Sequence, residues 1–355
     1  MKRSAAILLC MVLLLTGCSR SGEDPRPTGE TAVPQTETSA AATVPQTTEP
    51  QPERFLLTFV GDCTLGANPH LFGAPLGFPE TMGGDYEYPF LNVESYFSQD
   101  DLTFANLECA LTDTGFPVQK AHQFRGKEDY VRILTEHSVE AVSLSNNHSM
   151  DYGQEGYDNT RRALENAGVH YVEKDSTCLI TTDRGLTVGL YGALYTYIDE
   201  EAMVEAISQL RDQADIVIFA PHWGYEKSPH PHEEQIRLAH AAIDAGADLV
   251  WGHHTHVLQD MEQYKDGLIF YSMGNFCFGG IVSFFDLDSA IWQQEFLKAP
   301  DGTVTLGETT IIPVRISSRE DINNYQPTPY AVEDPGYQRV MDKIFGQQDS
   351  TLSPG

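Results

Sequence analysis

Basic residues are scarce in this chain, which has 22 lysines and arginines against 51 aspartates and glutamates in 355 residues. A protein that binds nucleic acid directly neutralises phosphates with a general basic surface, and this composition cannot supply one. We therefore expect no nucleic-acid partner. An anionic polymer would also be repelled, unless bound cations or a local basic cluster compensate for the excess negative charge.

Long apolar runs are few as well. One extends over residues 5–15, after two basic residues, and is too short to span a bilayer well but suits the apolar core of a signal peptide. The motif LTGC at residues 15–18 resembles a bacterial lipobox, although an ordinary signal peptide that contains a cysteine is the alternative. We expect residues 1–17 to be a lipoprotein signal peptide. The lipid on Cys18 then anchors the protein to the extracellular face of the bacterial cell membrane.

Large apolar residues are almost absent from residues 18–53, which are mainly Pro, Thr, Glu, Ser, Gln and Ala. Such a segment cannot bury enough surface to offset the entropy of ordering it, so we expect a disordered linker after the lipidated cysteine. The remaining length suffices for a large domain, which we place at residues 54–320, followed by a C-terminal extension at residues 321–355.

Cysteine is also scarce, and beyond Cys18 the chain has only Cys63, Cys109, Cys178 and Cys277. Cys63 and Cys109 each follow a candidate metal ligand described below. Alternation along a strand turns them away from that ligand, which favours small buried apolar residues. Neighbouring strands could instead bring this pair within disulfide reach, and the spacing does not decide between the two.

What the chain does contain, from residue 55 on, is an alternation of apolar, β-branched runs with amphipathic stretches. The runs predict buried strands, and the stretches predict helices. The expected strands lie at residues 55–62, 102–108, 141–148, 187–194, 215–224, 248–257 and 268–276, with later strands in 290–316. The expected helices lie at 157–168, 200–214, 233–246 and 335–346. Strands that alternate with helices predict an α/β layered fold.

Polar residues stand at the end of one apolar run after another, namely Asp62, Glu108, Asn147 with His148, His222 and His256. In layered α/β folds, ligands bind beyond the carboxyl ends of the strands, so these side chains can converge on one cleft. The segment DLVWGHHTHVLQ at residues 248–259 holds two further histidines. If it is extended, His254 and His256 point into the cleft, and His253 points the other way, into packing or a second shell.

These candidate ligands combine carboxylate, amide and imidazole groups without a thiolate. Such a set suits Mn, Fe or Zn better than Ca or Mg and argues against a structural zinc site. Glu108 is long enough to bridge two cations, and two ions about 3.5–4 Å apart would activate a water molecule and polarise the group that it attacks. The sequence therefore predicts one or two divalent metal ions as the cofactor.

In order along the chain, the motifs GD, NLE, NNH, HWG and GHxH resemble the CapA family of poly-γ-glutamate capsule synthesis proteins, as do SNNHSMDYG, GHHTHVLQ and YSMGNFCFG. The resemblance covers about residues 55–280. It implies the calcineurin-like metallophosphoesterase fold, a layered sandwich of two mixed β-sheets flanked by helices. It makes His148 the acid that protonates a leaving group, and it implies metal binding by Asp62, Glu108, Asn147, His222, His254 and His256.

Two positions depart from the wider metallophosphoesterase pattern, and one of them is the bridging carboxylate, which is Glu108 where those enzymes use aspartate. Those enzymes typically begin with D-x-H, whose histidine binds the first metal, whereas this chain has Thr64 at that position. One metal site therefore has fewer or weaker ligands, and phosphatase activity does not follow from the resemblance.

Four further residues are candidates for supporting roles. Arg125, in the cation cluster AHQFRGK, could clamp a carboxylate or phosphate in binding or catalysis, or belong to an ordinary surface loop. Asp151 could fix the tautomer of His148 for catalysis. Glu226 could touch the substrate, and Asn275 could line the cleft or form a structural turn.

The function expected from these residues is that of a membrane-tethered, metal-dependent hydrolase that uses metal-activated water in the biosynthesis of a capsule or other cell-surface polymer. The alternative is a non-catalytic assembly or export factor that binds an anionic polymer through the metal cleft. A solute-binding lipoprotein suits the lipobox but not the polar strand ends. The expected partners are the membrane, through the lipid on Cys18, and the polymer or its synthesis machinery.

Overall fold

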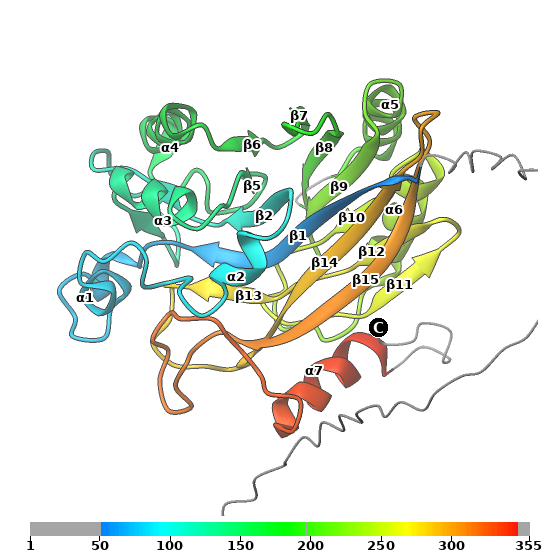
Figure 1. Ribbon diagram of the computed structural model, residues 1–355. Coiled ribbons are helices and arrows are strands. Elements are labelled where there is room, and N and C mark those ends of the chain that lie inside the picture. Colours follow the sequence, from blue (N-terminus) through cyan, green and yellow to red (C-terminus); the bar gives the residue numbers. More distant parts are fainter. Residues whose placement is uncertain (1–50, 196–197, 347–355) are drawn as a thin grey trace, which may run out of the picture. The chain divides into compact units, whose positions relative to one another are not determined.

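Two mixed β-sheets form the centre of the domain (Figure 1). The computed structural model describes residues 51–195 and 198–346. The first sheet has the strand order β16-β15-β14-β1-β2-β5-β6, with β13 beside β1. These strands are β1 (Glu53–Thr64), β2 (Leu102–Leu107), β5 (Ala141–Ser143), β6 (His170–Val172), β13 (Asn275–Phe278), β14 (Asp288–Lys298), β15 (Val304–Arg315) and β16 (Thr328–Pro329).

The second sheet has the order β11-β12-β10-β9-β8-β7. Its strands are β7 (Ser176–Thr181), β8 (Thr187–Leu194), β9 (Ile216–His222), β10 (Leu249–Trp251), β11 (Met261–Tyr264) and β12 (Gly267–Phe270). In both sheets, parallel strands at the centre are continued by antiparallel strands toward an edge. A separate short pair is formed by β3 (Ala110–Leu111) and β4 (Arg125–Gly126).

The largest apolar core lies between the two sheets. Along β1, alternate residues from Phe55 to Phe59 face it, because side chains of a strand repeat with period two. The ring of Phe59 lies 5.7 Å from that of Trp251 in the second sheet and 5.0 Å from that of Trp292 in the first. Trp251 also donates a hydrogen bond from Nε1 to the carbonyl of Val60, at 3.0 Å, which fixes β10 against β1.

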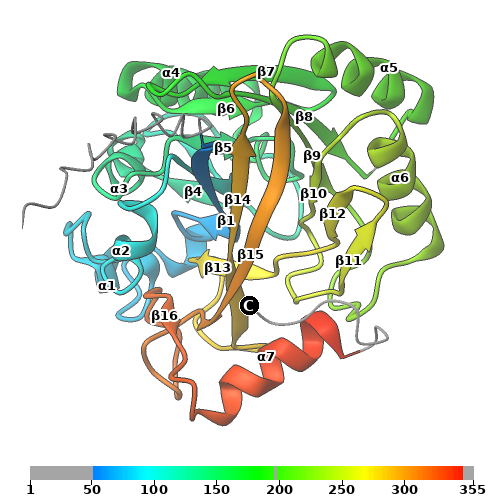
Figure 2. The same cartoon turned by 45° about the vertical axis from the view of Figure 1, so that its right-hand side comes forward.

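Helices cover the outer faces of both sheets, so the domain has four layers (Figures 1 and 2). On the first sheet these are α1 (Phe78–Met82), α2 (Glu94–Phe97), α3 (Val131–Thr135) and α4 (Gly153–Ala167). On the second sheet they are α5 (Glu200–Arg211) and α6 (Glu233–Asp244). α5 shows why the sequence folds this way: Asp199 caps its first turn, and Met203, Ile207 and Leu210 form its buried face. The layered sandwich expected from the sequence is confirmed.

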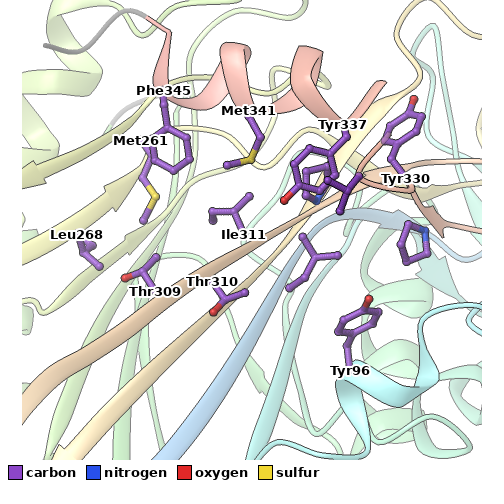
Figure 3. Close-up of a pocket in the computed structure, with 14 residues that line it drawn as sticks. Tyr96, Met261, Leu268, Thr309, Thr310, Ile311, Tyr330, Tyr337, Met341 and Phe345 are labelled. Atoms are coloured by element: carbon purple, nitrogen blue, oxygen red, sulfur yellow. The ribbon is translucent and has the colours of Figure 1, made fainter. Parts of the chain in front are cut away.

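The segment after residue 320 packs onto the same core. β16 pairs with β15, and α7 (Pro335–Phe345) buries Val340, Met341 and Ile344 against the inter-sheet core. α7 also covers one side of an apolar cavity of about 280 Å³, which is lined by side chains such as Ile311, Tyr337 and Met341 (Figure 3). None of the predicted site residues lines this cavity.

The predicted strands recur with three notable differences, of which the first is that the run at 268–276 is divided between β12, in the second sheet, and β13, in the first. The run at 141–148 is a strand only over Ala141–Ser143, and the run at 248–257 only over Leu249–Trp251, because the chain turns where the polar residues begin. The predicted signal peptide, Cys18 and the linker up to residue 50 lie outside the described residues. Among the helices of the described ranges, none is both long and apolar enough to cross a membrane.

Candidate metal centre

The six predicted ligands come together where parallel strands of both sheets end. The first sheet contributes Asp62 within β1, Glu108 directly after β2 and Asn147 in the loop after β5. The second sheet contributes His222 at the end of β9, and His254 and His256 in the segment after β10. The centre therefore exists only when the two sheets are packed together.

The start of the centre depends on a close approach of two strands. The amide of Asp62 donates to the carbonyl of Gly274, at 2.8 Å, just before β13 begins. A Cβ at Gly61 would lie 2.0 Å from the same carbonyl oxygen, so only glycine fits here. The register of β1 shifts between Phe59 and Asp62, which marks a bulge that re-aims the carboxylate.

One half of the centre consists of Asp62, Glu108 and His256, whose ligand atoms all lie within 4.8 Å of one another. His256 Nδ1 is 3.2 Å from Asp62 Oδ2 and 4.0 Å from Glu108 Oε2. Both carboxylate side chains are fully buried, and that of His256 is 11% exposed. Two carboxylates and an imidazole in a buried cluster are a donor set that a divalent metal ion suits.

The other half surrounds His222. Its Nε2 lies 2.7 Å from Asn147 Oδ1, 3.0 Å from His254 Nδ1 and 3.6 Å from Glu108 Oε1. Glu108 thus directs one carboxylate oxygen to each half of the centre. This is the position that a bridging ligand between two metal ions occupies.

The charges of the first half are set by burial and by proximity. Burial, and then the carboxylate of Asp62, raise the pKa of Glu108 well above its ordinary value. Burial by itself raises the pKa of Asp62, but contacts with His253 and His256 outweigh it and hold that pKa well below the usual range. Burial lowers the pKa of His256, yet the carboxylates of Glu108 and Asp62 raise it to about 9.

In the second half, the imidazoles are held neutral. Burial, and then the neighbouring His256, lower the pKa of His254 to about 4. Burial, and then His254, lower the pKa of His222 well below its ordinary value. Neutral imidazole is the form that binds metal, so this half is prepared to donate lone pairs near pH 7.

The residues present fit a divalent metal. Among the described residues, Asp62 Oδ2 and both oxygens of Glu108 are buried and accept no hydrogen bond. Buried carboxylate oxygens without a partner are costly, and a cation between them removes that cost.

A histidine–carboxylate pair lies at the edge of the centre. His148 Nδ1 is 2.7 Å from Asp151 Oδ2, which also accepts a hydrogen bond from the amide of Phe124 at 2.6 Å. His148 Nε2 faces the centre, 4.0 Å from Glu108 Oε1. Burial lowers the pKa of His148, and the hydrogen bond with Asp151 opposes that shift. The ring of Phe124 packs at 4.3 Å on that of His148 and holds it in place.

Lys120 is the cation that reaches this pair, and the sequence analysis did not select it. Its ammonium donates to the carbonyl of Asn147 at 2.8 Å and forms an ion pair with Asp151. The predicted cation, Arg125, lies elsewhere: its guanidinium stands over the rings of Phe72 and Tyr152, at 5.2 and 5.1 Å. Phe124, which directly precedes β4, packs against His148 at the edge of the centre instead.

The remaining candidates lie around the centre in different ways. Asn275 is buried at the start of β13, with Oδ1 3.0 Å from His256 Nδ1. Glu226 is exposed, and its charge acts on His254 and His256. The hydroxyl of Thr64 donates to the backbone carbonyl of Glu108 at 3.1 Å and so serves the backbone.

The predicted extended conformation of the segment with the three histidines was wrong. The segment after Trp251 is not extended, since His254 and His256 adopt positive φ values of 94° and 59°. His253 nevertheless packs on Trp251, with its Nδ1 3.2 Å from Asp62 Oδ1. Cys63 and Cys109 are buried free thiols, so the disulfide alternative does not apply.

Two asparagines that the sequence analysis passed over tie the loops together. Asn106 donates from Nδ2 to Asp62 Oδ1 at 2.8 Å. Asn146 donates to Asn106 Oδ1 at 3.1 Å and accepts from the amide of His148 at 3.1 Å. The signal was present in NLE and NNH, where an asparagine stands two residues or one residue before the candidate ligand.

Comparison with known proteins matches residues 56–280 to the family model "Bacterial capsule synthesis protein PGA_cap". The chain is 32% identical over 255 residues to the capsule biosynthesis protein CapA of Bacillus anthracis, covering 64% of this chain and 60% of that protein. It is 30% identical over 298 residues to the PGA biosynthesis protein CapA of Bacillus subtilis, covering 74% of each. The chain thus spans somewhat less than two thirds of the Bacillus anthracis relative.

Solved structures provide a more distant likeness. The NAD nucleotidase NadN of Haemophilus influenzae is similar with a TM-score of 0.42 and 10% identity, over 85% of this chain and 64% of that one. The 5'-nucleotidase of Candida albicans is similar with a TM-score of 0.39 and 14% identity, over 74% and 53%.

Proposed function

Because this chain belongs to the bacterial capsule synthesis family PGA_cap, we propose that it acts in the synthesis of a capsule polymer of the poly-γ-glutamate type as a metal-dependent hydrolase. The observation that carries the proposal is the buried donor group of Asp62, Glu108 and His256, with carboxylate oxygens that lack hydrogen-bond partners. A family role in polymer synthesis gives such a centre a substrate class. The bond that it cleaves is a phosphoester or an amide.

The proposed ligands form two groups, one for each of two ions. Asp62, Glu108 and His256 would hold one ion, and Asn147, His222 and His254 with Glu108 would provide ligands for a second. A bound divalent ion supplies Lewis-acid polarisation of the group under attack and lowers the pKa of a water molecule. Mn, Fe or Zn suits these oxygen and nitrogen donors.

His148 is the proton donor to the leaving group in this proposal. Its Nε2 faces the centre, and its Nδ1 is held by Asp151 at 2.7 Å, so the ring cannot rotate away from the leaving group. Asp151 stabilises the charged imidazole, and Lys120 keeps Asp151 from becoming an unpaired buried charge. Glu226 and Asn275 lie where a substrate approaches, and we assign them to binding.

We place the protein outside the cell, tethered to the membrane by a lipid on Cys18 and a linker that follows it. The support is the lipobox motif at residues 15–18 alone. Metabolic labelling of the expressed protein with a radiolabelled fatty acid tests this placement. Label in the wild type that a Cys18→Ser variant lacks is the expected result.

Elemental analysis and a hydrolysis assay test the main proposal. The purified full-length protein is expected to hold one or two equivalents of Mn, Fe or Zn, and a His254→Ala/His256→Ala variant is expected to lose them. With metal restored, wild-type protein should cleave a phosphodiester or a γ-glutamyl amide from a panel, and EDTA should stop the reaction. Absence of metal from reconstituted wild-type protein would refute the proposal.

One observation favours a second function, that of a non-catalytic factor that binds an anionic polymer. Thr64 stands where related enzymes carry a metal-binding histidine, and its hydroxyl donates a hydrogen bond to the backbone carbonyl of Glu108. The first half of the centre therefore has few protein ligands. A weakly ligated cation leaves coordination positions for the carboxylates of a polymer. Binding of poly-γ-glutamate that EDTA abolishes, without any cleavage, would favour this function over hydrolysis.

A further inference from the structure

We propose that His253 is a positioning residue that fixes the carboxylate of Asp62, so that Oδ2 alone faces the metal. The proposal rests on the metal centre described above. It concerns a histidine that pairs with the ligand His222 through a backbone bridge and directly precedes the ligand His254.

The geometry separates the two oxygens of Asp62. Oδ1 faces two nitrogens, Asn106 Nδ2 at 2.8 Å and His253 Nδ1 at 3.2 Å. Oδ2 faces His256 Nδ1 at 3.2 Å, inside the donor group. Oδ1 therefore accepts a hydrogen bond from Asn106 and has His253 beside it, whereas Oδ2 accepts no hydrogen bond among the described residues and lies inside the donor group.

The backbone of His253 is hydrogen-bonded and its ring is packed, while neither ring nitrogen makes a hydrogen bond among the described residues. Its side chain is fully buried, and its ring stands edge-on to that of Trp251 at 4.4 Å. Its amide donates to the carbonyl of Pro221 at 3.0 Å, and its carbonyl accepts from the amide of Trp223 at 3.1 Å. These bonds join the segment after β10 to the end of β9, so the ring has a fixed place from which to act on β1 in the opposite sheet.

The centre needs such a device because its first half has few ligands. The hydroxyl of Thr64 is committed to the carbonyl of Glu108, which leaves Asp62 with a larger share of the binding. A carboxylate that could rotate would lose entropy on binding and would offer either oxygen. Partners that orient a metal ligand are worth roughly 10–100-fold in metal affinity.

Metal titration of matched variants tests the role of His253. The wild type, His253→Phe and His253→Asn are each loaded with Co²⁺, and the Kd and the visible absorption spectrum are measured. His253→Phe keeps the ring and removes the nitrogen, whereas His253→Asn keeps an N–H near the place of Nδ1. His137→Phe is the control, because His137 is equally buried and packs on Phe90 away from the centre.

We expect His253→Phe to weaken Co²⁺ binding roughly 10–100-fold and to change the spectrum, with substantial recovery in His253→Asn. His137→Phe should match the wild type in both. If His253→Phe does not fold, His253→Leu replaces it.

Equal affinities in folded wild type and His253→Phe would overturn the inference. Equal weakening in His253→Phe and His253→Asn would also overturn it, because packing rather than a donor would then be at work. Failure of the wild type to bind Co²⁺ is a different result, since it removes the proposed metal centre itself.

Discussion

Glu108 is the residue that directs an oxygen to each of the two halves of the metal centre. Both of its oxygens are buried and lack hydrogen-bond partners among the described residues, and burial raises its pKa well above the ordinary value. In the metal-free protein this side chain is a source of instability rather than of stability. Metal binding, rather than a contribution to stability, therefore explains the presence of Glu108 at this position.

Replacing Glu108 with Gln should separate binding from stability. We expect metal affinity to fall by more than the roughly 10–100-fold that loss of an outer partner costs. In EDTA, the Tm of Glu108→Gln should be no lower than that of the wild type, because a buried charge is removed. Titration calorimetry and thermal melts measure the two quantities.

Glu140→Gln is the matched control for that substitution. Glu140 is also partly buried, and its Oε2 accepts a hydrogen bond from the amide of Thr103 at 2.8 Å, outside the metal centre. Its replacement should leave metal affinity unchanged. A Glu108→Gln protein that binds metal as the wild type does would contradict the bridging role.

Asp151 presents a second test at the scale of one residue. Asp151→Asn should leave the metal content unchanged and lower the hydrolytic rate roughly 10²–10⁴-fold, because His148 loses the partner that fixes its Nδ1. The ¹⁵N shifts of the His148 ring report which nitrogen carries the proton, independently of activity. An unchanged tautomer and rate would remove His148 and Asp151 from the proposed mechanism.

At the scale of elements, the strand ends were predictable, because buried parallel strands have a strong apolar pattern and polar residues interrupt it where each strand stops. The order of Asp62, Glu108 and His222 along the chain follows directly. The path after Trp251 was not predictable, since positive φ at His254 and His256 is imposed by tertiary contacts rather than by propensity. The contact between His253 and Asp62 joins the two sheets, and no local pattern reports it.

The short strand β4 shows a related limit. The cation cluster around Arg125 was recognised, but the residues that reach His148 and Asp151 precede this two-residue strand. Phe124 faces His148, and the guanidinium of Arg125 lies between two aromatic rings instead. Lys120 reaches the loop after β5 only because its segment folds back, which composition cannot show.

The helix α7 is fastened to β14 by an ion cluster that gives a prediction for stability. The buried carboxylate of Asp288 accepts two hydrogen bonds from Arg339, each at 2.7 Å, and lies 2.8 Å from the ammonium of Lys343. Asp288→Asn should lower the free energy of unfolding by about 1–3 kcal/mol at pH 7, because Arg339 loses its carboxylate partner and Lys343 loses one of two, Asp286 being the other. Urea denaturation measures it, and Asp321→Asn, in an exposed pair, is the control.

The same cluster gives the pH dependence its sign. Burial raises the pKa of Asp288, but hydrogen bonds from Arg339 and Lys343 outweigh it, so the folded pKa lies below the ordinary value. The stabilisation is therefore complete above the unfolded carboxyl pKa of about 3.9 and is lost as the pH falls through the lower folded value. The difference in free energy of unfolding between the wild type and Asp288→Asn should become smaller as the pH is lowered from 5 toward 2. A constant difference would contradict this assignment.

At the scale of the whole molecule, metal should act as a stabilising ligand. A divalent ion at about 100 times its Kd contributes about 2.7 kcal/mol, which raises the Tm of a domain of about 300 residues by roughly 4 °C. Differential scanning calorimetry with and without EDTA measures this shift. The His254→Ala/His256→Ala variant should lose it, and an equal shift in that variant would indicate that the excess acidic surface binds the ion instead.

The assembly of the centre from both sheets also bears on the order of events in folding. Asp62 pairs in register with Asn275, near the other end of the domain, and His222 lies in the opposite sheet. Contacts so far apart in sequence form late, after the chain has closed its long loops. A metal ion should therefore find no site in the folding transition state. The ion should therefore slow unfolding and leave the refolding rate nearly unchanged. It then stabilises the native state without taking part in the folding nucleus.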